Sequence, residues 1–370
     1  MNQLNRVVHL RIFSLPVWVV SLIFCLAGQN TLAVIKPPLT LDDYNRLVIQ
    51  YRFSLPDSGI YYAKKGLELS RKQHNLKGEG MMLNHWGIID DNQGRFDQAR
   101  QKYLQAIKVY RQANFSEGIA DETIRLGVTE MRKANFDTAI GFFLEALKIH
   151  EANHNLRGIM ECYDTLGEAY MGQSNYVTAI NYLTKAEQYC QRLPFMGLTL
   201  YIYNNLGVSY KETGHIKKAI AYLQKGVDLS NEPQYAGLHV TLLNSLGMAF
   251  AKDGQKERAV TLQLAALKQA REIKNYLREL QTLNGLADTY GNDNPSKALA
   301  YLQQALLLSR QKGAGKLTLE TLKRMADIYE DMGNYKESLR INKQEHALAD
   351  SIFNLAKATE ITNYIALKPV

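Results

Sequence analysis

Small residues recur along the chain at an almost fixed spacing, each inside a short run of apolar and polar residues. The runs include IRLGVTEM from residue 124, NNLGVSYK from residue 204 and NGLADTYG from residue 284. Five steps between successive small residues are forty residues long and one is thirty-nine: Gly87, Gly127, Gly167, Gly207, Gly247, Ala287 and Ala326. So regular a spacing indicates an internal repeat of about forty residues.

Two further small positions follow in each repeat. The second lies twelve residues after the first, at Ala99, Ala139, Ala179, Ala219, Ala259, then one place early at Ala298, and at Ser338. The third lies seven residues later, at Ala106, Ala146, Ala186, Gly226, Ala266 and Ala305, whereas Glu345 breaks the rule. Turn residues separate the first and second positions: Gly94, Gly214, Gly254 and Gly333, replaced elsewhere by Ala134, Ser174 and Asn294. This pattern predicts a closely packed, antiparallel helix pair in each repeat.

The Leu-Gly, Tyr and Ala positions resemble the tetratricopeptide repeat (TPR) family, most clearly in NNLGVSYKETGHIKKAIAYLQKG from Asn204 to Gly226. A forty-residue unit is similar to the longer-helix subclass of bacterial regulators and peptide receptors. The resemblance implies an all-α fold, a right-handed α-solenoid of about eight repeats. We expect a degenerate N-terminal repeat or cap at 34–79, seven repeats at 80–345, and a C-terminal capping helix and tail at 346–370.

The C-terminal segment allows a second interpretation. Asp350, Ser351 and Phe353 resemble the DSxF helix that closes the extracytoplasmic TPR region of bacterial sensor histidine kinases. The alternative function is therefore a sensory or regulatory module of a two-component-type system that acts with a membrane kinase. No kinase domain follows in this sequence, so that function would need a partner chain or a truncated gene.

The first thirty-three residues have the pattern of an export signal. Arg6 and Arg11 precede an apolar run from Ile12 to Gly28, and Thr31 and Ala33 occupy the small-residue positions of a signal-peptidase site. We expect cleavage after Ala33 and a periplasmic or extracellular protein with no later membrane span. An uncleaved, membrane-anchoring signal is the alternative.

Composition and net charge indicate a folded protein and limit the classes of partner that it could bind. Hydrophobic residues make up 46% and charged residues 22% of the chain, as in ordinary folded proteins. Loss of Arg6 and Arg11 with the signal lowers the net charge from +8 to +6. Because this charge is spread without a basic run, we expect no nucleic-acid partner. The sequence leaves the oligomeric state open.

HEANH at 150–154 is spelled like a zinc-protease helix, in which His150 and His154 would bind zinc and Glu151 would activate water. The repeat frame places it where a second helix ends, and no third histidine follows at the expected spacing. A zinc hydrolase is thus a remote alternative. We predict no catalytic residue, metal or cofactor.

Cys162 and Cys190 open and close one predicted helix pair. Antiparallel helices bring those ends together, and an exported protein can keep a disulfide. The sequence therefore allows a bridge, and equally two ordinary buried thiols.

By resemblance to the family, the first helix of each repeat lines a concave groove that binds a protein or an extended peptide. Asparagine recurs three residues before the first small position. Its amide can pair with a peptide backbone, or equally with a neighbouring helix. The mixed charge of this wall argues against a carboxylate clamp. The candidate partner-binding residues are Asn84, Asp164, Glu168, Asn204, Asn205, Lys211, Asn244, Asn284, Asp288 and Lys323.

Overall fold

The computed structural model describes residues 39–366, and the signal predicted at 1–33 lies outside this range. Within it all regular structure is helical, with sixteen α-helices and two short 3₁₀ helices, η1 (Pro233–Tyr235) and η2 (Gly291–Asp293). The α-helices are α2 (Leu41–Tyr51), α3 (Pro56–Lys72), α4 (Leu76–Asn92), α5 (Phe96–Gln112), α6 (Ser116–Arg132), α7 (Phe136–Ala152), α8 (Leu156–Gly172), α9 (Tyr176–Cys190), α10 (Met196–Glu212), α11 (Ile216–Leu229), α12 (Ala236–Lys252), α13 (Lys256–Glu272), α14 (Tyr276–Tyr290), α15 (Pro295–Gln311), α16 (Gly315–Asp331) and α17 (Tyr335–Ala366).

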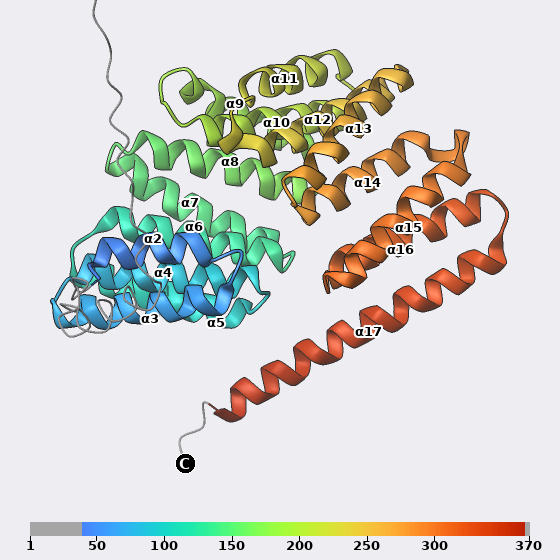
Figure 1. Cartoon of the computed structure of the whole chain (residues 1–370). Coiled ribbons are helices and arrows are strands. Elements are labelled where there is room, and N and C mark those ends of the chain that lie inside the picture. The colour runs from blue at the N-terminus through green and yellow to red at the C-terminus, as the bar shows by residue number, and fades with distance from the viewer. Residues whose placement is uncertain (1–38, 367–370) are drawn as a thin grey trace, which may run out of the picture.

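Consecutive helices pack as pairs, and each pair stacks on the next. Figure 1 shows the pairs following one another along a curved row, from α2 in blue to α17 in red. The predicted all-α solenoid is confirmed. The first helices of successive pairs begin forty or thirty-nine residues apart, at Leu76, Ser116, Leu156, Met196, Ala236, Tyr276 and Gly315.

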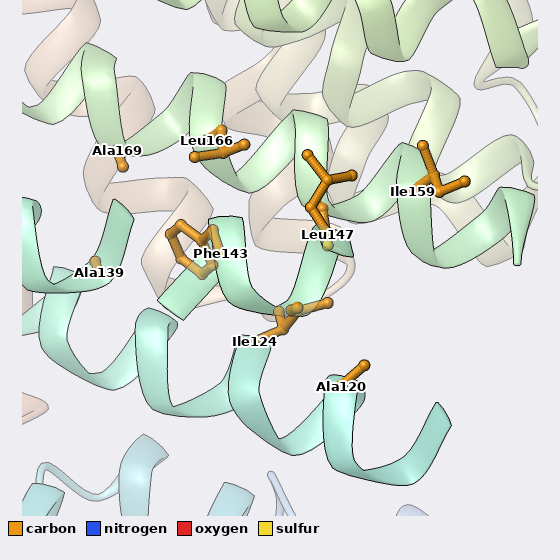
Figure 2. Packing of buried hydrophobic residues seen from close by; sticks show 10 residues of the cluster. Ala120, Ile124, Ala139, Phe143, Leu147, Ile159, Leu166 and Ala169 are labelled. Atoms are coloured by element: carbon orange, nitrogen blue, oxygen red, sulfur yellow. The ribbon is translucent and has the colours of Figure 1, made fainter. Parts of the chain in front are cut away.

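The small positions are where helices touch. A Cβ on Gly127 would lie 2.4 Å from the ring of Phe143, so α6 and α7 approach closely only because Gly127 has no side chain. Figure 2 shows Phe143 with Ile124, Leu147 and Leu166, where α6, α7 and α8 meet. Burying a large apolar side chain of this kind stabilises the fold by about 1.5–3 kcal/mol.

Most turns between helices use one residue in the left-handed backbone region. Gly94, Gly214, Gly254 and Gly333 have φ between 70° and 81°, and Ala134 and Ser174 take the same conformation at 64° and 59°. The predicted turn at Asn294 differs. There Gly291 has the positive φ of 44°. The side chain of Asn294 caps α15 by accepting a hydrogen bond from the backbone N–H of Lys297. This altered turn accompanies the single thirty-nine-residue step.

Two boundaries differ from the sequence interpretation. Helix α4 begins at Leu76, four residues before the expected start of the regular repeats. At the other end, the expected capping helix at 346–370 is no separate element, because α17 runs without a break from Tyr335 to Ala366. Neither glycine nor proline occurs in this segment to end a helix. No helix that the structure describes is long and apolar enough to span a bilayer.

Candidate functional site

The even-numbered helices form the inner wall of the curved row. Those from α4 to α14 contact one another across successive pairs; for example, α6 contacts α8 and α10 contacts α12. No comparable contact joins odd-numbered helices within the described residues, so the even-numbered side is the more tightly curved one. We call α4, α6, α8, α10, α12, α14 and α16 the inner wall.

At least three hollows lie along the inner wall within the part of the chain that the structure describes. The amino-terminal hollow, about 360 Å³, lies over α4, α6 and α8 and includes Asn84 and Glu122. The central hollow, about 190 Å³, lies over α8, α10, α12 and α14 and includes Tyr201 and Gln281. The carboxy-terminal hollow, about 280 Å³, lies over the last turns of α10, α12 and α14 and includes Lys211.

In the amino-terminal hollow, Asn84 is bonded to the next repeat. Its side-chain Nδ2 donates to Oε1 of Glu122 at 2.5 Å. The Glu122 side chain is 1% exposed, and burial raises its pKa to about 8, although the Asn84 bond and Arg125 oppose that shift. Asn84 thus supports a buried carboxyl group as well as lining the hollow.

Three predicted residues form one polar cluster between α8 and α10. Nδ2 of Asn205 donates to Oδ1 of Asp164 at 3.1 Å and to Oε1 of Glu168 at 3.2 Å. Burial, and then the neighbouring Glu168 carboxylate, raise the pKa of Asp164 well above its usual range. Glu168 and Asn205 line the central hollow, whereas Asp164 does not.

The asparagines three residues before the small position differ from one repeat to the next. Asn204 lines the central hollow, and its Oδ1 accepts from the hydroxyl of Ser245 at 2.8 Å. Asn244 is 9% exposed, and its Oδ1 lies against Gly285 of the next repeat, where a Cβ would be only 2.4 Å away. Asn284 is 7% exposed. Asn244 and Asn284 therefore present little side-chain surface to a ligand.

The remaining predicted residues lie toward the C-terminal end of the inner wall. Lys211 and Asp288 line the carboxy-terminal hollow. Lys211 pairs with Glu212 at 2.8 Å, and Asp288 pairs with Arg324 of the next repeat. Lys323 is exposed on α16.

Comparisons with known proteins agree with this architecture. A family model described as tetratricopeptide repeat matches residues 158–232. The fold is similar to that of a Rap protein complexed with Competence and Sporulation Factor, with a TM-score of 0.65, 13% identity, and 90% of this chain and 92% of that one covered. The apo quorum sensor NprR from B. thuringiensis has a TM-score of 0.63 at 15% identity, with 90% and 93% covered. The Rap conjugation gene regulator of plasmid pLS20, in complex with the Phr* peptide, has a TM-score of 0.61 at 15% identity, with 86% and 96% covered.

Residues 158–232 match the tetratricopeptide repeat family. Stacked helix pairs of the same form continue on both sides of this segment. The search of curated proteins returned no sequence match.

The TPR frame explains which groove residues the sequence analysis missed. The position six residues before the first small residue lines the amino-terminal or central hollow in every repeat from α4 to α14: Met81, Asp121, Glu161, Tyr201, Thr241 and Gln281. This position is almost one helical turn before the asparagine position, on the same face. A 3.6-residue period extended one turn toward the helix start would have found it.

The two cysteines of the third regular TPR are free thiols, so the possible bridge is not formed. Cys162 is buried with Phe143 and Leu147 of the preceding repeat. Cys190 packs with Leu183 and Ile202, toward the following repeat. The thiols belong to opposite interfaces of one helix pair. Cys190 is the last residue of α9, whereas Cys162 lies six residues inside α8 and does not open that helix as the sequence predicted.

The HEANH segment is a TPR helix end. Helix α7 stops at Ala152, and His154 has a φ of 53° in the turn that follows. His150 is fully buried, and its ring fills the space beside Gly158. The two histidines therefore do not share one helix face, as a zinc-protease site requires. Among the described residues, no three side chains of His, Cys, Asp or Glu could together hold a metal ion.

Proposed function

We propose that this protein is a non-catalytic scaffold that binds a protein or an extended peptide along the inner wall. The observation that carries the proposal is the run of three hollows from α4 to α14 on that single wall. Two proteins of similar fold, the Rap protein and the pLS20 regulator, were solved with a factor and a peptide bound, which supports this function.

The exposed residues of the central hollow suit this role better than the asparagines three residues before the first small position. Tyr201 is 42% exposed on α10, and Gln281 is exposed on α14. Together they offer an aromatic surface and an amide that both donates and accepts, a combination common at binding surfaces. Asn244 and Asn284 are buried, so their replacement would disturb the repeat contacts first.

Selection from a displayed library of random peptides tests the proposal. The double variant Tyr201→Ala/Gln281→Ala is expected to bind the selected peptides at least about tenfold more weakly, because truncating an interface tyrosine commonly costs 2 kcal/mol or more. Leu264→Ala is the control. Leu264 is 43% exposed on α13 and lines none of the three hollows, so peptide binding should be unchanged. Failure to select peptides, or equal binding by all three proteins, would contradict the proposal.

We propose further that the protein is exported and loses residues 1–33. The charged start, apolar run and small-residue cleavage site support this. N-terminal sequencing of protein recovered outside the cytoplasm is expected to begin at Val34. Recovery of the uncut chain in membranes would instead support an anchoring signal.

A further inference from the structure

A buried carboxylate oxygen in the amino-terminal hollow has no partner. Oε1 of Glu122 accepts from Asn84 at 2.5 Å, whereas Oε2 has almost no solvent-accessible surface and forms no hydrogen bond. Native proteins rarely bury an acceptor without a partner, because its lost hydration is then uncompensated. The residue lines the hollow, so a ligand there could supply the missing donor.

The same hollow carries more negative than positive charge. Its acidic residues are Glu117, Asp121, Glu122 and Glu161, and its basic residues are Arg125 and Arg157. Arg125 pairs with Glu161 at 3.6 Å, and the guanidinium of Arg157 lies 5.1 Å from the centre of the Phe195 ring. Within residues 39–351, no lysine or arginine forms an ion pair with Glu117, Asp121 or Glu122, although Oδ1 of Asp121 lies 3.6 Å from Nε2 of His150.

Size and geometry favour an organic cation over a metal ion. The acidic side chains do not converge as metal ligands among the described residues. The hollow, about 360 Å³, has the size of a small-molecule pocket, far larger than one ion needs. Met81 and Tyr110 also line it, and they provide apolar surface for the methylene stem of a long cationic side chain.

We propose that the amino-terminal hollow receives a lysine or arginine side chain of the bound peptide, with Oε2 of Glu122 as its acceptor. This inference depends on the proposed function, because it names the residue type that one part of the groove selects. Asp121, with 58% of its side chain exposed, supplies a second carboxylate at the mouth of the hollow.

Binding of a cation in this hollow would displace a proton. Burial raises the pKa of Glu122 to about 8, so near pH 6 the carboxyl group is mostly neutral and a cation must compete with its proton. Desolvation by the hollow walls, and then Glu161, raise the pKa of Asp121 to about 6 in spite of its exposure. The charged and titratable groups around Glu122 and Asp121 are Tyr103 and Tyr110 of α5, Glu117 and Arg125 of α6, His150 of α7, and Arg157 and Glu161 of α8.

Calorimetric titration of the full chain with agmatine, a small guanidinium compound, tests the hollow without any peptide. We expect saturable binding at pH 8 that weakens toward pH 6, by up to about tenfold per pH unit while Glu122 is mostly protonated. Glu122→Gln should weaken binding at pH 8 at least about tenfold. Butanol, which has no charge, should not bind.

Glu130→Gln is the matched control, because Glu130 is a buried glutamate about two turns further along α6 that does not line the hollow. It should bind agmatine as the unmodified chain does. Absence of saturable agmatine binding, or equal binding by the unmodified chain and Glu122→Gln, would overturn the inference.

The peptide selection separates this inference from the proposed function. Peptides selected by the unmodified chain should share a lysine or arginine at one position, and the Glu122→Gln chain should lose that preference. If agmatine binds but no peptide is selected, the groove function fails while the cation site stands. If peptides are selected without a basic residue, the groove function stands and the inference fails.

Discussion

At the scale of residues, the inner wall depends on polar side chains bonded across repeats. Asn84 reaches Glu122, Asn205 reaches Asp164, and Ser245 reaches Asn204, each about forty residues away. Such bonds offset part of the cost of burying these polar groups and fix one repeat against the next. Asn84 and Asn204 also line hollows, so these bonds are compatible with both interpretations of the recurring asparagines, and their role in binding stays a prediction.

The raised pKa of Glu122 makes stability depend on pH. Its pKa is about 8 in the folded chain against an ordinary 4.5, so the folded state holds a proton that the unfolded state releases between these values. Stability should therefore fall as pH rises from about 5 to 8, by up to about 1.4 kcal/mol per pH unit. Glu122→Gln removes this dependence. Urea denaturation at pH 5, 7 and 9 should show that the variant becomes more stable relative to the unmodified chain as pH rises. A difference in unfolding free energy that is the same at all three pH values would contradict the assignment.

At the scale of elements, each helix pair depends on the turn residue that ends its first helix as much as on the side chains packed between its two helices. The left-handed residue after a helix recurs at one frame position, whether that residue is Gly94, Ala134 or Ser174. Non-glycine residues lose about 1–2 kcal/mol in this conformation. The turn is retained in these repeats because packing of the two helices outweighs that cost.

Ala134→Gly should stabilise the protein by about 1 kcal/mol, because glycine adopts the φ of 64° without steric cost. Ala113→Gly is the matched control, since Ala113 follows α5 as its C-cap residue and has an ordinary φ of −81°. There glycine only adds freedom to the unfolded chain and should destabilise the protein. Thermal or urea unfolding of both variants measures the difference, and equal shifts would show that the turn conformation is unimportant.

At the scale of the whole molecule, curvature creates the candidate site. Contacts between even-numbered helices of successive pairs draw the inner wall together, and side chains from three or four helices then border each hollow. A single repeat has no such hollow. The proposed binding of an extended ligand therefore depends on the stacked array, as is usual for solenoid proteins.

The sequence by itself determined the repeat length and the helix pairs. Both follow from local periodicity, since Gly127 or Ala139 must be small whichever repeat lies beside it. The helices that line the inner wall were indicated only by resemblance to the TPR family. Only the tertiary structure decided which polar side chains are left exposed or unpaired and are therefore available to a ligand. Asn244 is buried against Gly285, Oε2 of Glu122 is left without a partner, and Cys162 and Cys190 serve opposite interfaces. The reason is physical. The exposure and hydrogen bonding of each side chain depend on side chains about forty residues away, and local sequence periodicity does not predict those contacts.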